Sequence, residues 1–190
     1  MSITVMNTRI EIILGCMFSG KSTELLRRCN RYKAICKSIV LINHSLDIRT
    51  DNSIRTHDGT KCVAIKLTSL MSLVHDKQYR DILYSSSVIG IDEGQFFDDL
   101  VEFVLAVESL NKIVIIAGLD GDSERKPFGQ LLQCIPLCDS VVKLTALDMV
   151  KKDGTAAIFS KRVENMKSTI VIGAEEVYQA VSRATYLSLP

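Results

Sequence analysis

Residues 10–22 read Ile-Glu-Ile-Ile-Leu-Gly-Cys-Met-Phe-Ser-Gly-Lys-Ser, an apolar run followed by a glycine-bounded loop. The run 10–14 predicts a strand buried on both faces of a sheet. Apolar side chains then recur near a spacing of 3.6 and predict a helix over 22–37. Residues 15–22 fit the pattern G-x-x-x-x-G-K-[ST], which is meaningful only between a strand and a helix. Both are expected here, so the segment predicts a phosphate-binding P-loop.

Composition sets the broad class. The chain has 190 residues, of which 47% are hydrophobic and 24% charged, which is typical of one globular domain with at most a small appendage. With 23 basic and 22 acidic side chains the net charge is +1, so bulk charge attracts neither nucleic acid nor a membrane surface. Because no apolar run approaches the ~20 residues of a membrane span and no signal-peptide pattern begins the chain, we expect a soluble cytoplasmic protein.

Cysteines give no sign of a metal site or a disulfide framework. There are six of them, and none forms a C-x-x-C pair. We expect small, buried, free thiols, since unpaired cysteine is among the most buried residue types.

Beyond the P-loop, short β-rich runs alternate with amphipathic stretches, which predicts an α/β fold with a parallel sheet flanked by helices. The expected strands are 38–43, 62–67, 88–91 and 112–117, and the expected helices are 70–83 and 100–110. From about residue 139 the pattern becomes β-rich, with strands at 141–144, 156–159 and 167–172 and a short helix at 175–183. We therefore expect a nucleotide-binding domain over 1–140 and a small second unit over 141–190.

The P-loop assigns roles to several residues. Its backbone N–H groups and the following helix N-terminus would surround phosphate oxygens, Lys21 would reach the β- and γ-phosphates, and the Ser22 hydroxyl would bind Mg²⁺. The predicted strand 88–91 ends at Asp92, the expected second Mg²⁺ contact, and Glu93 follows as a candidate general base. The expected phosphate-binding residues are Gly15, Cys16, Met17, Phe18, Ser19, Gly20, Lys21 and Ser22.

Several longer motifs resemble the type II thymidine kinase family. They are the P-loop with Thr-Glu-Leu after it, Asp-Glu-Gly-Gln-Phe-Phe at 92–97, Arg-Lys-Pro-Phe-Gly at 125–129, Thr-His-Asp at 56–58, Val-Lys-Leu-Thr-Ala at 142–146 and Ser-Lys-Arg at 160–162. The resemblance covers about residues 9–186. It implies a RecA-like sheet, a C-terminal lasso domain and a homotetramer. It also implies ATP-dependent phosphorylation of the 5′-hydroxyl of thymidine or a related deoxynucleoside, in nucleotide salvage and DNA precursor supply.

The same resemblance implies further site residues. Glu93 matches the family's catalytic carboxylate, and Gly94 and Gln95 continue that motif beside ATP. Asp47 and Arg49 match a D-x-R motif whose arginine lies near the phosphates, where it would stabilise transition-state charge. His57 lies in a matching segment, and we expect it to serve the loop rather than catalysis. Around the nucleoside the resemblance implies Met17, Leu119, Ser123, Ser160, Thr169, Ile170, Val171, Ile172, Gly173 and Tyr178.

Two departures from the family stand out. Ser123 occupies a position where the family commonly has an aromatic residue. The family's two C-x-x-C pairs, which bind structural zinc, align with Asp148 and Lys151 and with Ser182 and Thr185, so we predict no structural zinc site. In its absence, burial of apolar side chains is expected to hold the C-terminal unit: Val141, Leu144, Ile158, Ile172, Val177 and Val181.

Two other functions fit a P-loop. One is a nucleotide-hydrolysing switch or ATPase, and the other is a catalytically silent nucleotide-binding protein, which the joint presence of Lys21, Ser22, Asp92 and Glu93 disfavours. A Rossmann dehydrogenase is disfavoured because G-x-G-x-x-G is absent after the first strand. Turnover of ATP that requires a deoxynucleoside distinguishes the kinase from the switch.

Overall fold

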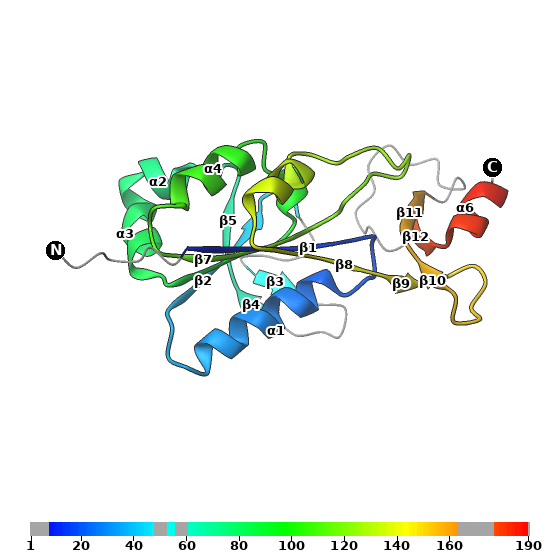
Figure 1. The fold of residues 1–190 in the computed structure, drawn as a ribbon, viewed down its shortest axis with the longest axis horizontal. Coiled ribbons are helices and arrows are strands. Elements are labelled where there is room, and N and C mark those ends of the chain that lie inside the picture. Colours follow the sequence, from blue (N-terminus) through cyan, green and yellow to red (C-terminus); the bar gives the residue numbers. More distant parts are fainter. Residues whose placement is uncertain (1–7, 48–52, 56–60, 163–176, 190) are drawn as a thin grey trace.

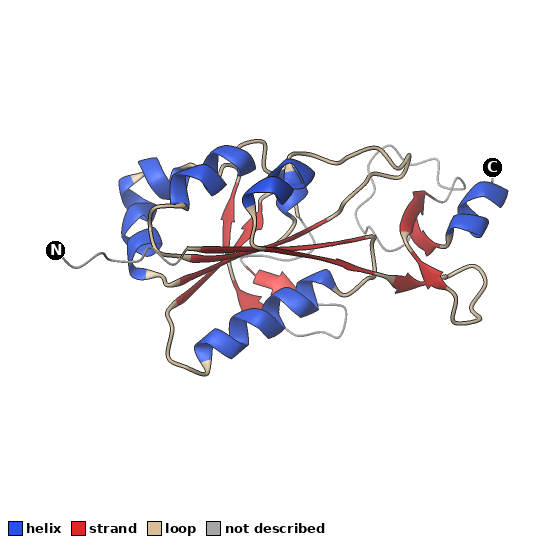
Figure 2. Ribbon diagram, in the orientation of Figure 1, coloured by secondary structure: helices blue, strands red, loops and turns tan. Residues whose placement is uncertain are grey.

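A computed structural model describes residues 8–47, 53–55, 61–162 and 177–189. Its centre is a six-stranded sheet in the order β5-β2-β6-β7-β1-β8, and every neighbouring pair is parallel. Helices cover both faces (Figures 1 and 2), with α1 on one face and α2, α3 and α4 on the other. The expected α/β architecture is therefore confirmed.

The elements of this part of the chain follow the predicted order. The sheet strands are β1 (Arg9–Gly15), β2 (Ile39–His44), β5 (Ile65–Leu67), β6 (Val88–Ile91), β7 (Ile113–Gly118) and β8 (Ser140–Leu144). The helices are α1 (Lys21–Lys33), α2 (Ser72–His75), α3 (Lys77–Ser85) and α4 (Leu100–Val107), with 3₁₀ turns η1 (Gly94–Phe96) and η2 (Leu131–Leu137). A separate antiparallel pair joins β3 (Ser53–Arg55) to β4 (Lys61–Val63).

Strand β1 is central because its side chains alternate between two cores. Ile10 and Ile12 pack with the cluster beneath α2, α3 and α4, and Ile13 packs with Leu25 and Leu26 of α1. Glu11 interrupts the apolar pattern, yet it is only 6% exposed, because Arg28 on α1 and Arg9 both lie 2.7 Å from its carboxylate. The strand is thus buried on both faces, as its sequence predicts.

Three predicted elements differ in detail. The run 62–67 is two strands rather than one, because β4 pairs with β3 and β5 pairs with β2. The helix expected over 70–83 is broken between α2 and α3, where Asp76 has an extended backbone with φ −81° and ψ 124°. The helix expected over 22–37 ends at Lys33.

The C-terminal part differs more from expectation. The run 141–144 was expected in the small unit, but β8 is the edge strand of the main sheet and pairs with β1. The small unit begins with the hairpin of β9 (Ala146–Leu147) and β10 (Ala156–Ala157), and β11 (Phe159–Arg162) then pairs with β12 (Tyr178–Val181). The helix expected over 175–183 is wrong, because 178–181 is a strand and α6 spans Arg183–Ser188. The strand expected over 167–172 lies outside the described residues.

The cysteine prediction is confirmed in part. All six thiols are free, but only Cys16, Cys29 and Cys134 are buried. Burial raises the pKa of Cys29 to about 12 and that of Cys134 to about 11, so both stay protonated and unreactive near neutral pH. Cys62 and Cys138 are half-buried, and Cys36 is exposed at the end of the turn after α1.

Candidate active site

The carboxyl ends of four adjacent strands bring the predicted residues to one edge of the sheet. The loop 15–22 follows β1, Asp92 and Glu93 follow β6, Leu119 follows β7, and Asp47 lies three residues after β2. Parallel strands of an α/β sheet present such segments side by side, and this edge is where ligands bind in open sheets.

The P-loop has the backbone that its glycines allow. Gly20, the N-cap of α1, lies in the left-handed region with φ 81° and ψ 21°. At Gly15 a Cβ atom would lie 2.5 Å from Ser19 Oγ and 2.7 Å from the Leu144 carbonyl oxygen, so a side chain would displace both. The glycines therefore permit a loop that curls back over the end of β1.

Lys21 points back into that loop. Its Nζ donates to the Cys16 carbonyl oxygen at 2.8 Å, and Ser19 Oγ donates to the same oxygen at 2.8 Å. Burial lowers the pKa of Lys21, and the negative charges of Glu93 and Asp92 oppose that change. The carboxylates after β6 thus lie close enough to act electrostatically on the P-loop lysine.

Asp92 and Glu93 are held differently. Asp92 is 3% exposed, and its backbone N–H donates to the Ile42 carbonyl oxygen at 2.9 Å, which continues the pairing of β6 with β2. Glu93 has φ 54° and ψ 40°, a left-handed backbone that is uncommon for this residue type. That turn changes the chain direction directly after the strand, so the two consecutive carboxylates can face different groups.

Gln95 joins Glu93 to the end of β7. Its Nε2 donates to Glu93 Oε2 at 2.6 Å, and its Oε1 accepts from the Leu119 backbone N–H at 2.9 Å. Gln95 is 2% exposed, so its amide orientation is set by these two partners. Gln95 thus supports Glu93, and its expected place beside ATP stays a prediction.

Two residues at this edge were missed by the sequence reasoning. Asp120 follows β7 and acts on Lys21 electrostatically, and its Oδ2 lies 2.5 Å from Lys143 Nζ. Buried Asn43, the fifth residue of β2, donates to Asp47 Oδ2 at 2.8 Å. Both lie at or near the end of a sheet strand, which is a signal that the sequence carries once the strands are known.

Contacts from the C-terminal unit reach this edge. Ser160 on β11 is 5% exposed, and its Oγ accepts from the Met17 backbone N–H at 2.9 Å. Cys16 Sγ lies 3.5 Å from the Ala157 carbonyl oxygen on β10. Tyr178 is in β12, opposite Arg162 of β11, and Ser123 lies in the loop after β7. Met17 and Ser160 are therefore neighbours, and their expected place around the nucleoside stays a prediction.

Some predicted residues lie outside the described residues, namely Arg49, His57, Thr169, Ile170, Val171, Ile172 and Gly173.

Within the described part of the chain, no group of three or more His, Cys, Asp or Glu side chains is arranged to hold a metal ion. In the same part, no helix has the length and apolar character needed to cross a bilayer.

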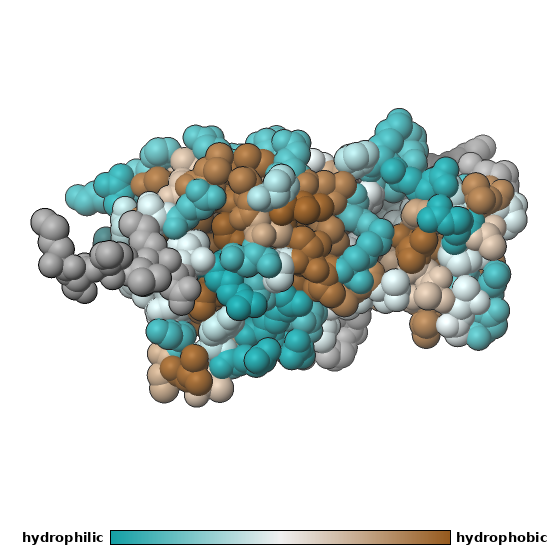
Figure 3. Space-filling model, viewed as in Figure 1, coloured by the Kyte–Doolittle hydropathy of each residue, from teal (hydrophilic) through white to brown (hydrophobic). Residues whose placement is uncertain are grey.

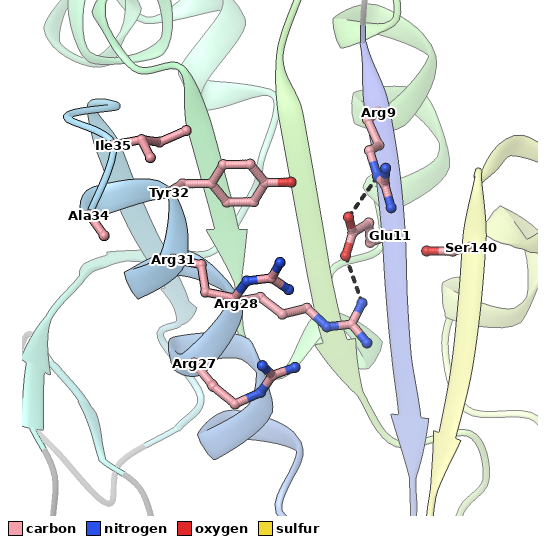
Figure 4. A pocket seen from close by; sticks show the side chains of 9 residues that line it. All are labelled: Arg9, Glu11, Arg27, Arg28, Arg31, Tyr32, Ala34, Ile35 and Ser140. Carbon is pink, nitrogen blue, oxygen red and sulfur yellow. Dashed lines mark hydrogen bonds and ion pairs between the residues drawn. The ribbon is translucent and has the colours of Figure 1, made fainter.

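A pocket of about 700 Å³ lies between α1 and the amino end of β1, away from the P-loop (Figure 4). Of its four arginines, Arg9, Arg27 and Arg28 form ion pairs with two carboxylates. Glu11 pairs with Arg9 and Arg28, and Glu24 pairs with Arg27 and Arg28. The same pairing with Arg27 and Arg28 holds the pKa of Glu24 down to about 2, although burial acts against it. The Arg28–Glu11 pair connects α1 to β1, and the pocket shares no residue with the edge described above.

Comparison with known proteins agrees with this geometry. The family model described as thymidine kinase matches residues 8–186. Thymidine kinase of monkeypox virus is 43% identical over 94% of this chain and 96% of its own length. Thymidine kinase of vaccinia virus (strain Western Reserve) is 44% identical over the same shares. A solved DNA replication initiation factor has a TM-score of 0.45 at 14% identity, covering 74% of this chain and 40% of that one. A family match over nearly the whole chain, with the P-loop and Asp92–Glu93 at one sheet edge, shows that this chain belongs to the thymidine kinase family.

Proposed function

We propose that this protein transfers the γ-phosphoryl group of ATP to the 5′-hydroxyl of thymidine or a related deoxynucleoside and so supplies DNA precursors by nucleotide salvage. The observation that carries the proposal is that the P-loop with Lys21 and the carboxylates of Asp92 and Glu93 follow β1 and β6 at the same edge of the parallel sheet, where the carboxylates act electrostatically on the lysine. A P-loop binds the phosphates, and a carboxylate beside it can receive a proton from the attacking hydroxyl.

The P-loop is proposed to bind the phosphates of ATP. Lys21 donates to the Cys16 carbonyl oxygen, so its ammonium points at the inner face of the loop. An incoming phosphate offers a stronger, charge-assisted partner than a carbonyl oxygen. Phosphate charge also favours the protonated lysine and opposes the effect of burial on its pKa.

Glu93 is the proposed general base. Gln95 donates to one of its carboxylate oxygens at 2.6 Å, which limits the rotation of the side chain. A fixed carboxylate that can accept the 5′-hydroxyl proton lowers the barrier by positioning as well as by proton transfer. Arg49, on the D-x-R motif, is proposed to stabilise charge on the transferred group.

The residues present fit Mg²⁺. Asp92 is a carboxylate at the end of β6 that acts on Lys21, and the Ser22 hydroxyl belongs to the first turn of α1 directly after that lysine. Oxygen ligands of this kind are those that Mg²⁺ prefers. When bound, the ion would neutralise phosphate charge. Asp92 and Ser22 are proposed to hold it, with water completing its coordination.

The nucleoside is proposed to bind between the P-loop and the C-terminal unit. The hydrogen bond between Met17 and Ser160 joins these two parts, and Leu119 follows β7 at the same edge. We propose that the lasso begins after β8 and includes Ser160, 169–173 and Tyr178. Ser123, with its small side chain, is proposed to leave more room beside the sugar or base than an aromatic residue would.

A homotetramer is proposed for the assembled enzyme. Apolar side chains gather over α4 and η2 on the face shown in Figure 3. Leu105 of α4, Ile135 of η2 and Val141 of β8 are 50%, 40% and 42% exposed. Such a surface favours association, and light scattering of the purified protein measures the number of chains. Cytoplasmic localisation and the absence of zinc are also proposed.

One assay tests the proposed function. The protein is incubated with ATP, Mg²⁺ and each natural deoxynucleoside in turn, and nucleoside monophosphate is measured alongside ADP. Formation of thymidine 5′-monophosphate at a rate matching ADP release is the expected result. ADP release that is equal with and without nucleoside would instead identify a hydrolysing P-loop protein.

A further inference from the structure

A single buried carboxylate joins two distant parts of the C-terminal unit. Asp148 is 1% exposed, and its two oxygens accept four hydrogen bonds. Oδ1 accepts from the backbone N–H groups of Val150 at 3.0 Å and Lys151 at 2.9 Å. Oδ2 accepts from the Ser182 backbone N–H at 2.8 Å and the Thr185 hydroxyl at 2.6 Å. The first pair shapes the turn after β9, and the second reaches the start of α6.

The start of α6 is built around the same group. Ser182 is the N-cap residue, and its Oγ accepts from the Thr185 backbone N–H at 3.3 Å. The hydroxyls of Ser182 and Thr185 lie 3.1 Å apart, and both residues are buried. Asp148, Ser182 and Thr185 thus form one hydrogen-bonded group, called here the Asp148 cluster.

This group does not fit zinc. The family's zinc thiolates align with Asp148, Lys151, Ser182 and Thr185, and the structure brings these four positions together. Their side chains supply one carboxylate, two hydroxyls and an ammonium, whereas structural zinc takes thiolate or imidazole ligands. The carboxylate is already saturated by protein donors, and the Lys151 side chain is exposed.

Helix α6 leads from this cluster to the loop after β7. The Tyr186 hydroxyl donates to the Ser123 carbonyl oxygen at 2.9 Å, and the Arg125 guanidinium lies 4.3 Å from the centre of the Tyr186 ring. Arg125 has a left-handed backbone with φ 66°, so this loop adopts a defined turn beneath the tyrosine. On the other side of α6, β12 pairs with β11 and sets Ala180 opposite Ser160.

We propose that Asp148 is a positioning residue, and that the Asp148 cluster replaces a structural metal in holding β12 and α6 against the nucleoside side of the active site. This inference rests on the proposed function. Charge-assisted hydrogen bonds in a buried site are stronger than neutral ones, and four of them leave the carboxylate fully satisfied. Burial of apolar side chains also stabilises this unit, since Val177 is 3% and Val181 0% exposed. Val141, which was expected to contribute in the same way, lies in the main sheet and is 42% exposed.

The main test variant, Thr185→Val, removes one hydrogen-bond donor to Asp148 and leaves both the Asp148 carboxylate and the Ser182 N-cap in place. Thr185→Val keeps the side-chain shape and deletes the hydroxyl, Thr185→Ser restores the hydroxyl, and Asp148→Asn removes the charge. Asp153→Asn is the matched control, because Asp153 lies in the same hairpin, is exposed, and accepts from neighbouring Thr155, whose backbone N–H lies at 2.9 Å. Hydrogen exchange of the amides in 178–189 is measured on the full chain, together with the thymidine KM, kcat and zinc content.

We expect Thr185→Val to speed exchange across 178–189 by about 5- to 10-fold and to raise the thymidine KM by a similar factor, with ATP affinity unchanged. Thr185→Ser and Asp153→Asn should match the unaltered protein, which should contain no stoichiometric zinc. Unaltered exchange in Thr185→Val, or about one zinc per chain, would overturn the inference. Exchange needs no catalysis, so faster exchange in a protein without kinase activity would reject only the proposed function.

Discussion

The Ser160 hydroxyl accepts a hydrogen bond from the backbone N–H of Met17 at 2.9 Å, although the two residues are 143 positions apart. Met17 lies in the P-loop and Ser160 on β11, so this bond joins the P-loop directly to the C-terminal unit. In the proposed function, the same bond would connect the phosphate site to the nucleoside site.

Replacing Ser160 tests that connection. Ser160→Ala leaves the Met17 N–H without its acceptor in a partly buried place, and we expect the thymidine KM to rise about 3- to 10-fold. Ser188→Ala is the matched control, because the Ser188 hydroxyl donates to a carbonyl oxygen of its own helix at 3.0 Å. Steady-state kinetics at saturating ATP measures both, and an unchanged KM in Ser160→Ala would show that the bond does not position the nucleoside.

Glu93→Gln tests the general base. The amide cannot take up the 5′-hydroxyl proton, so we expect kcat to fall by about 10² or more while ATP binding persists. Glu124→Gln is the control, since Glu124 is exposed and its carboxylate lies 2.6 Å from Lys126 Nζ. Near-normal turnover of Glu93→Gln would remove Glu93 from the proposed role.

Lys21→Ala tests the P-loop. Loss of the ammonium should abolish phosphorylation and leave far-ultraviolet circular dichroism unchanged, because Lys21 is the first residue of α1 and alanine favours helices. Lys33→Ala, at the exposed last turn of the same helix, should keep full activity. An active Lys21→Ala enzyme would contradict the phosphate-binding assignment.

Asp148 predicts a specific dependence of stability on pH. Burial by itself raises the pKa of Asp148, but hydrogen bonds from Thr185, Lys151 and Ser182 outweigh it and hold that pKa well below the usual range. A lowered native pKa stabilises the fold above the unfolded value of about 3.9 and loses that contribution as pH falls towards the native pKa. The difference in unfolding free energy between the unaltered protein and Asp148→Asn should therefore be constant from about pH 8 to 5 and shrink below about pH 4. Denaturant unfolding at each pH measures it, and a difference that grows on acidification would contradict the assignment.

The central strand, the P-loop segment and the helix after it followed from the sequence because each signal is local. The run 10–14, the loop 15–22 and the helix that begins at Lys21 are contiguous, so strand, P-loop and helix could be assigned without knowing any distant contact. Asp92 and Glu93 were found in the same way, at the end of an apolar run. Alternation of strands and helices then determined a parallel sheet, because each helix returns the chain to start the next strand in the same direction.

Only the tertiary structure decided which distant segments meet. Strand β8 joins β1 across the sheet edge, and residues 178–181 form a strand because β11 offers them backbone partners, which no local pattern records. The Asp148 cluster arises in the same way. The sequence marked Ser182 and Thr185 only as positions that lack the family's zinc thiolates, and the fold carries them to a carboxylate 34 and 37 positions earlier. Local patterns determine secondary structure and short motifs, whereas pairing across the chain depends on long-range backbone hydrogen bonds and burial that exist only once the chain has folded.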